Sequence, residues 1–114
     1  MYKIINQEKE TVAYIQNMMI LNKKREKVIG LLIGDCFFGN DNKVIGKIID
    51  QTAYLLNGEI IGKIEMDKDK KDPAPKKGLM LEAWDILSNI KSHTSDWITI
   101  SKKWSKKTLQ EVLK

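Results

Sequence analysis

Four short segments of the chain share one pattern, namely Thr11-Val-Ala-Tyr-Ile15, Lys27-Val-Ile-Gly-Leu31, Lys43-Val-Ile-Gly-Lys47 and Glu59-Ile-Ile-Gly-Lys63. They begin sixteen residues apart and align without a gap. The alignment places Val12, Val28, Val44 and Ile60 in one column, and Tyr14, Gly30, Gly46 and Gly62 in another. A fixed period indicates one structural unit used several times, so this repeat decides the fold.

The same period runs through the other half of each unit, where Ile4, Ile20, Cys36 and Thr52 align. Short runs rich in Ile, Val, Tyr and Phe are typical of strands. Polar breaks divide each unit at 6–10, 22–26, 39–42 and 57–58, and tighter breaks join the units at 17–18, 34–35 and 50–51. Asn57-Gly58 is typical of a type I′ turn, which requires positive φ at both central residues. The sequence therefore predicts eight short strands arranged as four hairpins.

The predicted fold is mainly β, with four sequential sixteen-residue hairpins gathered around a pseudo-four-fold axis and an α-helical C-terminal tail. Isolated hairpins are marginal, so the strands need a shared apolar face. Glycine in the third column lets backbones approach closely near the axis. A plain β-bulge in an open meander is the alternative explanation for the glycines.

A family resemblance rests on VAYI at 12–15, the VIG and IIG returns at 28, 44 and 60, and the Tyr54-Leu-Leu-Asn-Gly58 hairpin. These residues resemble the bacterial four-fold beta-flower domain over residues 2–65. The resemblance implies four hairpins around a pseudo-four-fold axis and brings no activity or ligand. A weaker resemblance to PRC-barrel domains rests on Ile45-Gly-Lys-Ile-Ile-Asp50 and Asn57-Gly-Glu-Ile-Ile-Gly62, and it does not predict four copies.

With 114 residues, the chain has room for one compact domain and an appendage. We expect a four-hairpin domain at 1–65, a charged linker with two prolines at 66–78 and a mainly helical segment at 79–114. Leu79, Met80, Ala83, Trp84, Leu87 and Ile90 have the spacing of an amphipathic helix. A second helix could begin at Ser95 and carry Trp97, Ile98, Ser101 and Trp104 on one side. The alternative is a strand at 97–100 and a shorter helix with a Thr108-Leu-Gln-Glu111 capping box.

Few residues suggest chemistry, and the sequence predicts no catalytic, cofactor-binding or metal-binding site. The only histidine, His93, lies in a polar break with no orienting acid. The only cysteine, Cys36, falls in an apolar column and is expected to pack as a small hydrophobe. A lone cysteine fits a reducing, cytoplasmic compartment. No signal peptide or membrane-spanning stretch is expected.

Two function hypotheses follow from the tail, and an enzyme built from dispersed residues ranks third. The first is a non-enzymatic protein-interaction module that docks a protein partner or a second copy through Trp84, Trp97 and Trp104. The second is nucleic-acid binding through Lys102, Lys103, Lys106 and Lys107, which flank Trp104. Residues 91–114 carry six lysines against two acidic residues, within a total net charge of +5.

Overall fold

The structure is a computed structural model that describes residues 2–39, 44–66, 77–88, 90 and 98–113. Its strands are β1 (Tyr2–Ile5), β2 (Thr11–Gln16), β3 (Met19–Asn22), β4 (Val28–Ile33), β5 (Cys36–Phe38), β6 (Val44–Ile49), β7 (Thr52–Leu55) and β8 (Ile60–Met66). Its helices are α1 (Lys77–Ser88) and α2 (Leu109–Leu113). Most of the predicted linker therefore lies outside the described residues.

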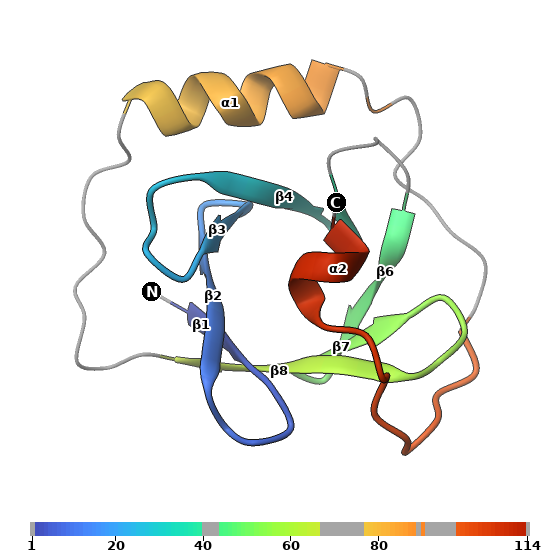
Figure 1. The fold of residues 1–114 in the computed structure, drawn as a ribbon. Helices are drawn as coiled ribbons and strands as arrows, with labels where there is room; N and C mark the ends of the chain where they lie inside the picture. The colour runs from blue at the N-terminus through green and yellow to red at the C-terminus, as the bar shows by residue number, and fades with distance from the viewer. Residues whose placement is uncertain (1, 40–43, 67–76, 89, 91–97, 114) are drawn as a thin grey trace.

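The eight strands form one closed antiparallel barrel in sequence order, which confirms a mainly β fold. Each strand pairs with its neighbours along the chain, and β1 pairs with β8 to complete the circle (Figure 1). Closure leaves no unpaired strand edge in the barrel, so the main-chain hydrogen bonds of short strands are satisfied without a covering sheet.

The connections differ in length at the two ends of the barrel. At one end, two-residue turns join β2 to β3, β4 to β5 and β6 to β7, and Asn17, Met18, Asp50 and Gln51 all have positive φ. At the other end the connections are longer. The type I′ prediction for Asn57-Gly58 is wrong, because only Gly58 has positive φ. The Leu55 amide donates to Glu59 O at 2.8 Å, so the two residues lie within a wider loop.

The strand register corrects the ungapped alignment. The bulged hairpins pair Ile4 with Ala13, Ile20 with Gly30, Phe37 with Gly46, and Ala53 with Gly62. Ala13 therefore occupies the position that the alignment gave to Tyr14, and Phe37 and Ala53 replace Cys36 and Thr52. The cause is the connection after Leu21, which contains one residue more than the connection after Ile5. The sixteen-residue period is thus interrupted once.

Gly46 illustrates why small residues are needed in this register. A Cβ at that position would overlap the carbonyl oxygen of Tyr54 and would lie 2.8 Å from Cζ of Phe37. The expectation of a close backbone approach at the glycines is confirmed here. The adjacent position on β6 holds the extra residue of the bulge, Ile45, which packs against the core.

Helix α2 closes the end of the barrel with the longer connections, which is called the plugged end below. Leu109 and Leu113 are buried in the same cluster as Ile20 and Phe37, and Figure 1 shows α2 inside the ring of strands. The predicted capping box is confirmed, since the Thr108 amide donates to Glu111 Oε1 and the Glu111 amide donates to Thr108 Oγ1, both at 3.2 Å. The barrel core therefore includes residues from the far end of the described chain.

The longer second helix is wrong within the described residues, because 98–108 are not helical. The segment instead runs beside the start of β8. The Ile60 amide donates to Lys103 O at 2.8 Å, and the Ser105 amide donates to Ile60 O at 2.7 Å. These two bonds satisfy main-chain groups that a helix would satisfy internally, so pairing with the barrel replaces helical structure here.

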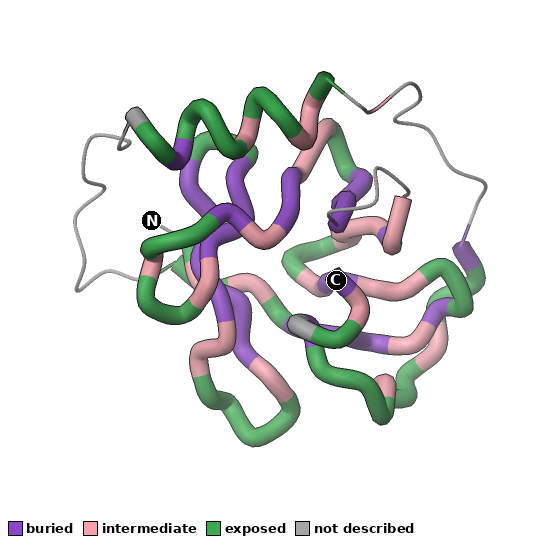
Figure 2. Tube along the Cα trace, turned by 45° about the horizontal axis from the view of Figure 1, so that its top comes forward, coloured by how far each residue is buried: buried purple, intermediate pink, exposed green. Residues whose placement is uncertain are grey.

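Helix α1 lies outside the barrel, across β3 and β4 (Figure 1). Its Leu79 is buried against Tyr14, Leu21 and Leu31, and Ala83 and Leu87 pack against the same cluster. Buried residues lie where α1 meets the barrel, whereas the turns and the outer side of the helix are exposed (Figure 2). No helix in the described part of the chain is long and apolar enough to cross a membrane.

Candidate functional site

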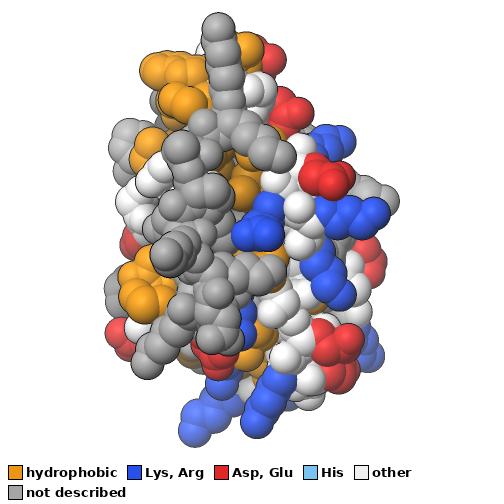
Figure 3. All heavy atoms as spheres, turned by 90° about the vertical axis from the view of Figure 1, so that its left-hand side faces the viewer, with side chains coloured by type: hydrophobic (Ala, Val, Ile, Leu, Met, Phe, Trp, Pro, Cys, Tyr) orange, Lys and Arg blue, Asp and Glu red, His pale blue; other side chains and the backbone are white. Residues whose placement is uncertain are grey.

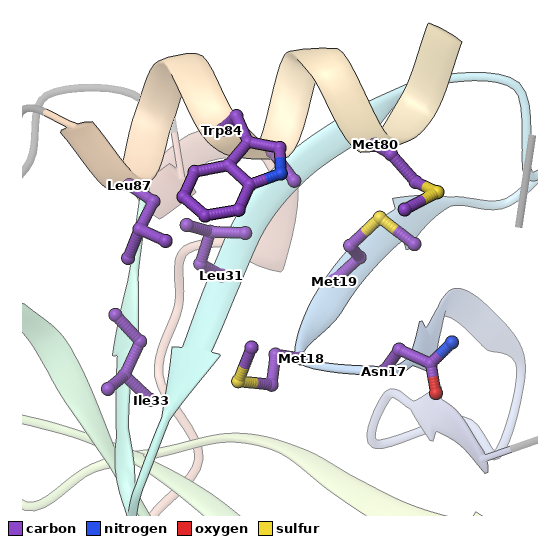
Figure 4. Close-up of a pocket in the computed structure, with 9 residues that line it drawn as sticks. Asn17, Met18, Met19, Leu31, Ile33, Met80, Trp84 and Leu87 are labelled. Carbon is purple, nitrogen blue, oxygen red and sulfur yellow. The ribbon is translucent and has the colours of Figure 1, made fainter. Parts of the chain in front are cut away.

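An apolar groove lies between α1 and the β2–β3 turn (Figure 4). It has a volume of about 280 Å³. Its lining, called the α1 groove below, consists of Asn17, Met18, Met19, Leu31, Ile33, Met80, Ala83, Trp84 and Leu87. These residues come from α1, β3, β4 and the turn that precedes β3, so three separate stretches of sequence meet here.

The groove exists because α1 contacts the barrel along one edge of its surface. Leu79 is buried, but Met80 and Trp84 are 46% and 63% exposed. The three residues share the spacing of one amphipathic face, but the barrel covers only Leu79. In Figure 4 the Trp84 ring extends from α1 above Leu31 on β4. The helix therefore presents a second apolar stripe that the barrel does not cover.

Met18 forms the opposite wall of the groove and is 59% exposed. The turn holds it at φ 69°, a conformation that favours glycine. Figure 4 also shows Met80 directed toward Met19. Unbranched thioether side chains adapt to differently shaped partners, and a large aromatic ring supplies much contact area. This combination is suited to holding an apolar side chain.

Catalytic chemistry has no support in the groove. Its only polar lining residue is Asn17, so the described lining offers no acid, base or nucleophile. Across the described residues there is also no group of three or more His, Cys, Asp or Glu side chains that could hold a metal ion. Cys36 is buried, and its thiol donates to Asp35 Oδ1 at 3.5 Å. His93 lies outside the described residues.

The three tryptophans do not form one surface in the described structure. Trp84 lines the α1 groove, whereas Trp104 is half-buried and forms a bridge with Ile60 at the plugged end of the barrel. Trp97 lies outside the described residues. Of the two described tryptophans, only Trp84 therefore lies in an exposed apolar cluster, and Figure 3 shows hydrophobic side chains gathered where α1 lies.

The four predicted nucleic-acid contacts lie in the extended segment 101–107, which runs beside the start of β8 and leads to α2. Lys102, Lys103, Lys106 and Lys107 are all exposed. Lys106 and Lys107 line a hollow of about 420 Å³ together with Trp104 and Glu8. The hollow thus contains an acidic side chain as well as basic ones, which weakens its attraction for a phosphate.

Sequence reasoning missed Met18 and Met80. Their contribution depends on which side of α1 faces the barrel and on the type of turn that precedes β3. A methionine in a two-residue turn, where glycine is favoured, is the one sequence signal that could have drawn notice to Met18. No family model, no curated protein and no solved structure matches the chain.

Proposed function

We propose that this chain is a non-enzymatic protein-interaction module that docks a partner's apolar side chains in the α1 groove. The observation that carries the proposal is the exposure of Trp84, at 63%, beside Met18 and Met80 in a groove almost without polar groups. Large exposed apolar clusters on small domains are typical of interaction sites. The partner is a second copy of the chain or an apolar segment of another protein.

The barrel supports this role as a rigid platform. Main-chain pairing around the closed circle fixes β3 and β4, and α1 is tied to β4 because Glu82 Oε2 accepts a hydrogen bond from the Val28 amide at 2.9 Å. Both walls of the groove are therefore held in place before a partner arrives. Preorganisation of this kind lowers the entropic cost of binding.

Trp84→Ala tests the proposal, with Leu81→Ala as the matched control. Leu81 is on the same helix and is 58% exposed, but it does not line the groove. Light scattering over a concentration series would measure self-association, and selection from a displayed peptide library would measure binding to other sequences. Association or peptide binding that is lost in Trp84→Ala and kept in Leu81→Ala supports the proposal. Equal effects of the two substitutions, or no association with any peptide or copy, contradict it.

A finer assignment of the fold accompanies the function. We propose that the barrel is a four-fold beta-flower domain of bacterial origin, working in a reducing cytoplasm. Support comes from the small residues Ala13, Gly30, Gly46 and Gly62, which occupy the same register in the four bulged hairpins. The buried, reduced thiol of Cys36 fits the compartment.

Nucleic-acid binding is the second candidate, and one observation favours it: all four lysines that flank Trp104 are exposed. We expect salt-dependent affinity for single-stranded DNA if they contact phosphates. Electrophoretic mobility at low salt would measure it. Replacement of Lys102, Lys103, Lys106 and Lys107 by Gln should then abolish the shift, and no shift by the unsubstituted chain would exclude this function.

A further inference from the structure

The end of the barrel opposite α2 opens into a second hollow, called the barrel mouth below. Its volume is about 420 Å³. Its lining consists of Tyr2, Ile15, Gln16, Asn17, Met18, Leu32, Ile48, Gln51 and Ile64. The two-residue turns lie at this end, whereas α2 occupies the end with the longer connections.

The base of the mouth is a ring of branched aliphatic side chains, one each from β2, β4, β6 and β8. These are Ile15, Leu32, Ile48 and Ile64. Ile15 belongs to the buried core, and Leu32, Ile48 and Ile64 pack against it but are only partly buried, with no helix of the described residues over them. The described chain therefore leaves a preformed apolar surface at this end.

Hydrogen bonds hold this ring in position. The Leu32 amide donates to Met18 O at 2.8 Å, the Ile48 amide donates to Asp35 O at 2.7 Å, and the Ile64 amide donates to Gln51 O at 2.8 Å. Each bond links a ring residue to the neighbouring two-residue turn. The ring and the turns above it consequently form one rigid unit.

The rim of the mouth is polar but uncharged. Tyr2, Gln16, Asn17 and Gln51 supply hydroxyl and amide groups, and no lining residue carries a formal charge. A charged ligand would lose its hydration without gaining a counter-ion. A neutral molecule with an apolar body and one polar group matches both the ring and the rim.

Two of the three two-residue turns at this end border the mouth. Met18 and Gln51 both line the mouth, and both have positive φ, at 69° and 64°. The third two-residue turn does not line the mouth, and there Gly34 takes the positive φ, at 61°. Side chains are thus kept in an unfavourable backbone conformation at the two turns that border the hollow. Lys9 and Arg25, in the connections at the opposite end, also have positive φ, at 64° and 59°, so this conformation is shared by both ends of the barrel.

We propose that the barrel mouth binds a small neutral amphiphile, with its hydrocarbon part on the aliphatic ring and its hydroxyl or amide group at Gln51 and the neighbouring rim. The site is distinct from the α1 groove, although Asn17 and Met18 border both. Gln51 borders only the mouth, which makes it the residue of choice for a test.

Hexan-1-ol is a suitable probe, and hexanoate is its charged counterpart. In protein labelled at isoleucine and leucine methyl groups, hexan-1-ol should shift the NMR signals of Leu32, Ile48 and Ile64 saturably and leave that of Ile86 on α1 unchanged. Hexanoate should bind at least about tenfold more weakly, because its carboxylate must be desolvated. Equal binding of the two probes, or unsaturable shifts spread over the protein, would overturn the proposal.

Gln51→Gly and Lys9→Gly form a matched pair of variants. Both residues are exposed with φ 64°, but Lys9 lies in the β1–β2 connection at the plugged end. Both variants should fold at least as stably as the unsubstituted chain, because glycine tolerates this conformation. Gln51→Gly should weaken hexan-1-ol binding about fivefold through loss of a hydrogen bond, whereas Lys9→Gly should not change it. Unchanged affinity in Gln51→Gly would show that Gln51 does not hold the polar group and would contradict the proposed orientation.

Discussion

The two ends of the barrel are made by the same strands but are completed in different ways. At the plugged end, Leu109 and Leu113 of α2 are buried among strand side chains. At the mouth, Leu32, Ile48 and Ile64 face a hollow of about 420 Å³. The plugged end adds buried apolar area that stabilises the fold, whereas the mouth keeps apolar area accessible for binding. Stability and function are therefore expected to respond to substitutions at opposite ends.

Leu113→Ala should have the largest effect, because it empties the plugged end. Leu113 is 2% exposed, and loss of its side chain would leave a cavity beside Gly30. We expect the free energy of unfolding to fall by about 3 kcal/mol, as measured by urea denaturation. The control, Leu56→Ala at a residue 51% exposed, should change it by less than about 0.5 kcal/mol. Similar losses in both variants would mean that α2 does not act as a plug.

Gly46→Ala tests the layer between the two ends. The new Cβ would overlap the Tyr54 carbonyl oxygen, so β6 and β7 would have to shift apart. We expect a loss of about 2 kcal/mol in the same assay. Gly78→Ala is the control, because a Cβ there meets nothing within 4 Å and Gly78 lies in α1. That substitution should raise stability slightly, and a Gly46→Ala variant of full stability would refute the close approach.

Thr108→Ala should loosen the plug without removing it. Its hydroxyl accepts a hydrogen bond from the Glu111 amide at the start of α2, so the free energy of unfolding should fall by about 1 kcal/mol. Glu111→Gln should retain most of the stability, since a glutamine side-chain oxygen can accept the same hydrogen bond from the Thr108 amide. Thermal unfolding followed by circular dichroism would separate the two variants, and an equal loss in both would show that charge is what matters at this position.

Gln51→Gly should have the smallest effect and the opposite sign. Relief of the positive φ at 64° should raise the free energy of unfolding by about 0.5 kcal/mol. Lys9→Gly should give a similar gain at the plugged end, because its φ is the same. Urea denaturation of both would measure it. A loss of stability in Gln51→Gly alone would mean that Gln51 supports the fold.

The strands were predictable because their apolar runs and polar breaks are local signals. The register was not, because the ungapped alignment places Val28 with Val12, whereas the strand pairing places Val28 with Thr11. A valine fits a strand equally well in either position. Bulges and insertions of one residue become visible only when the pairing of strands is known.

The groove and the tail were predictable only in part. The capping box of α2 is local and was confirmed. The extended segment at 101–105, in contrast, depends on main-chain hydrogen bonds to Ile60, which is distant in sequence. The spacing of Met80 and Trp84 is compatible with a buried face, and only the docking of α1 on β4 decides that they are exposed. Tertiary contacts overrode the periodicity in both places.

The seam between β1 and β8 has a consequence for how the barrel forms. Tyr2 pairs with Met66, so the barrel can close only after β8, the last strand, has formed. Contacts between residues this far apart in sequence form slowly, because a long loop must be ordered first.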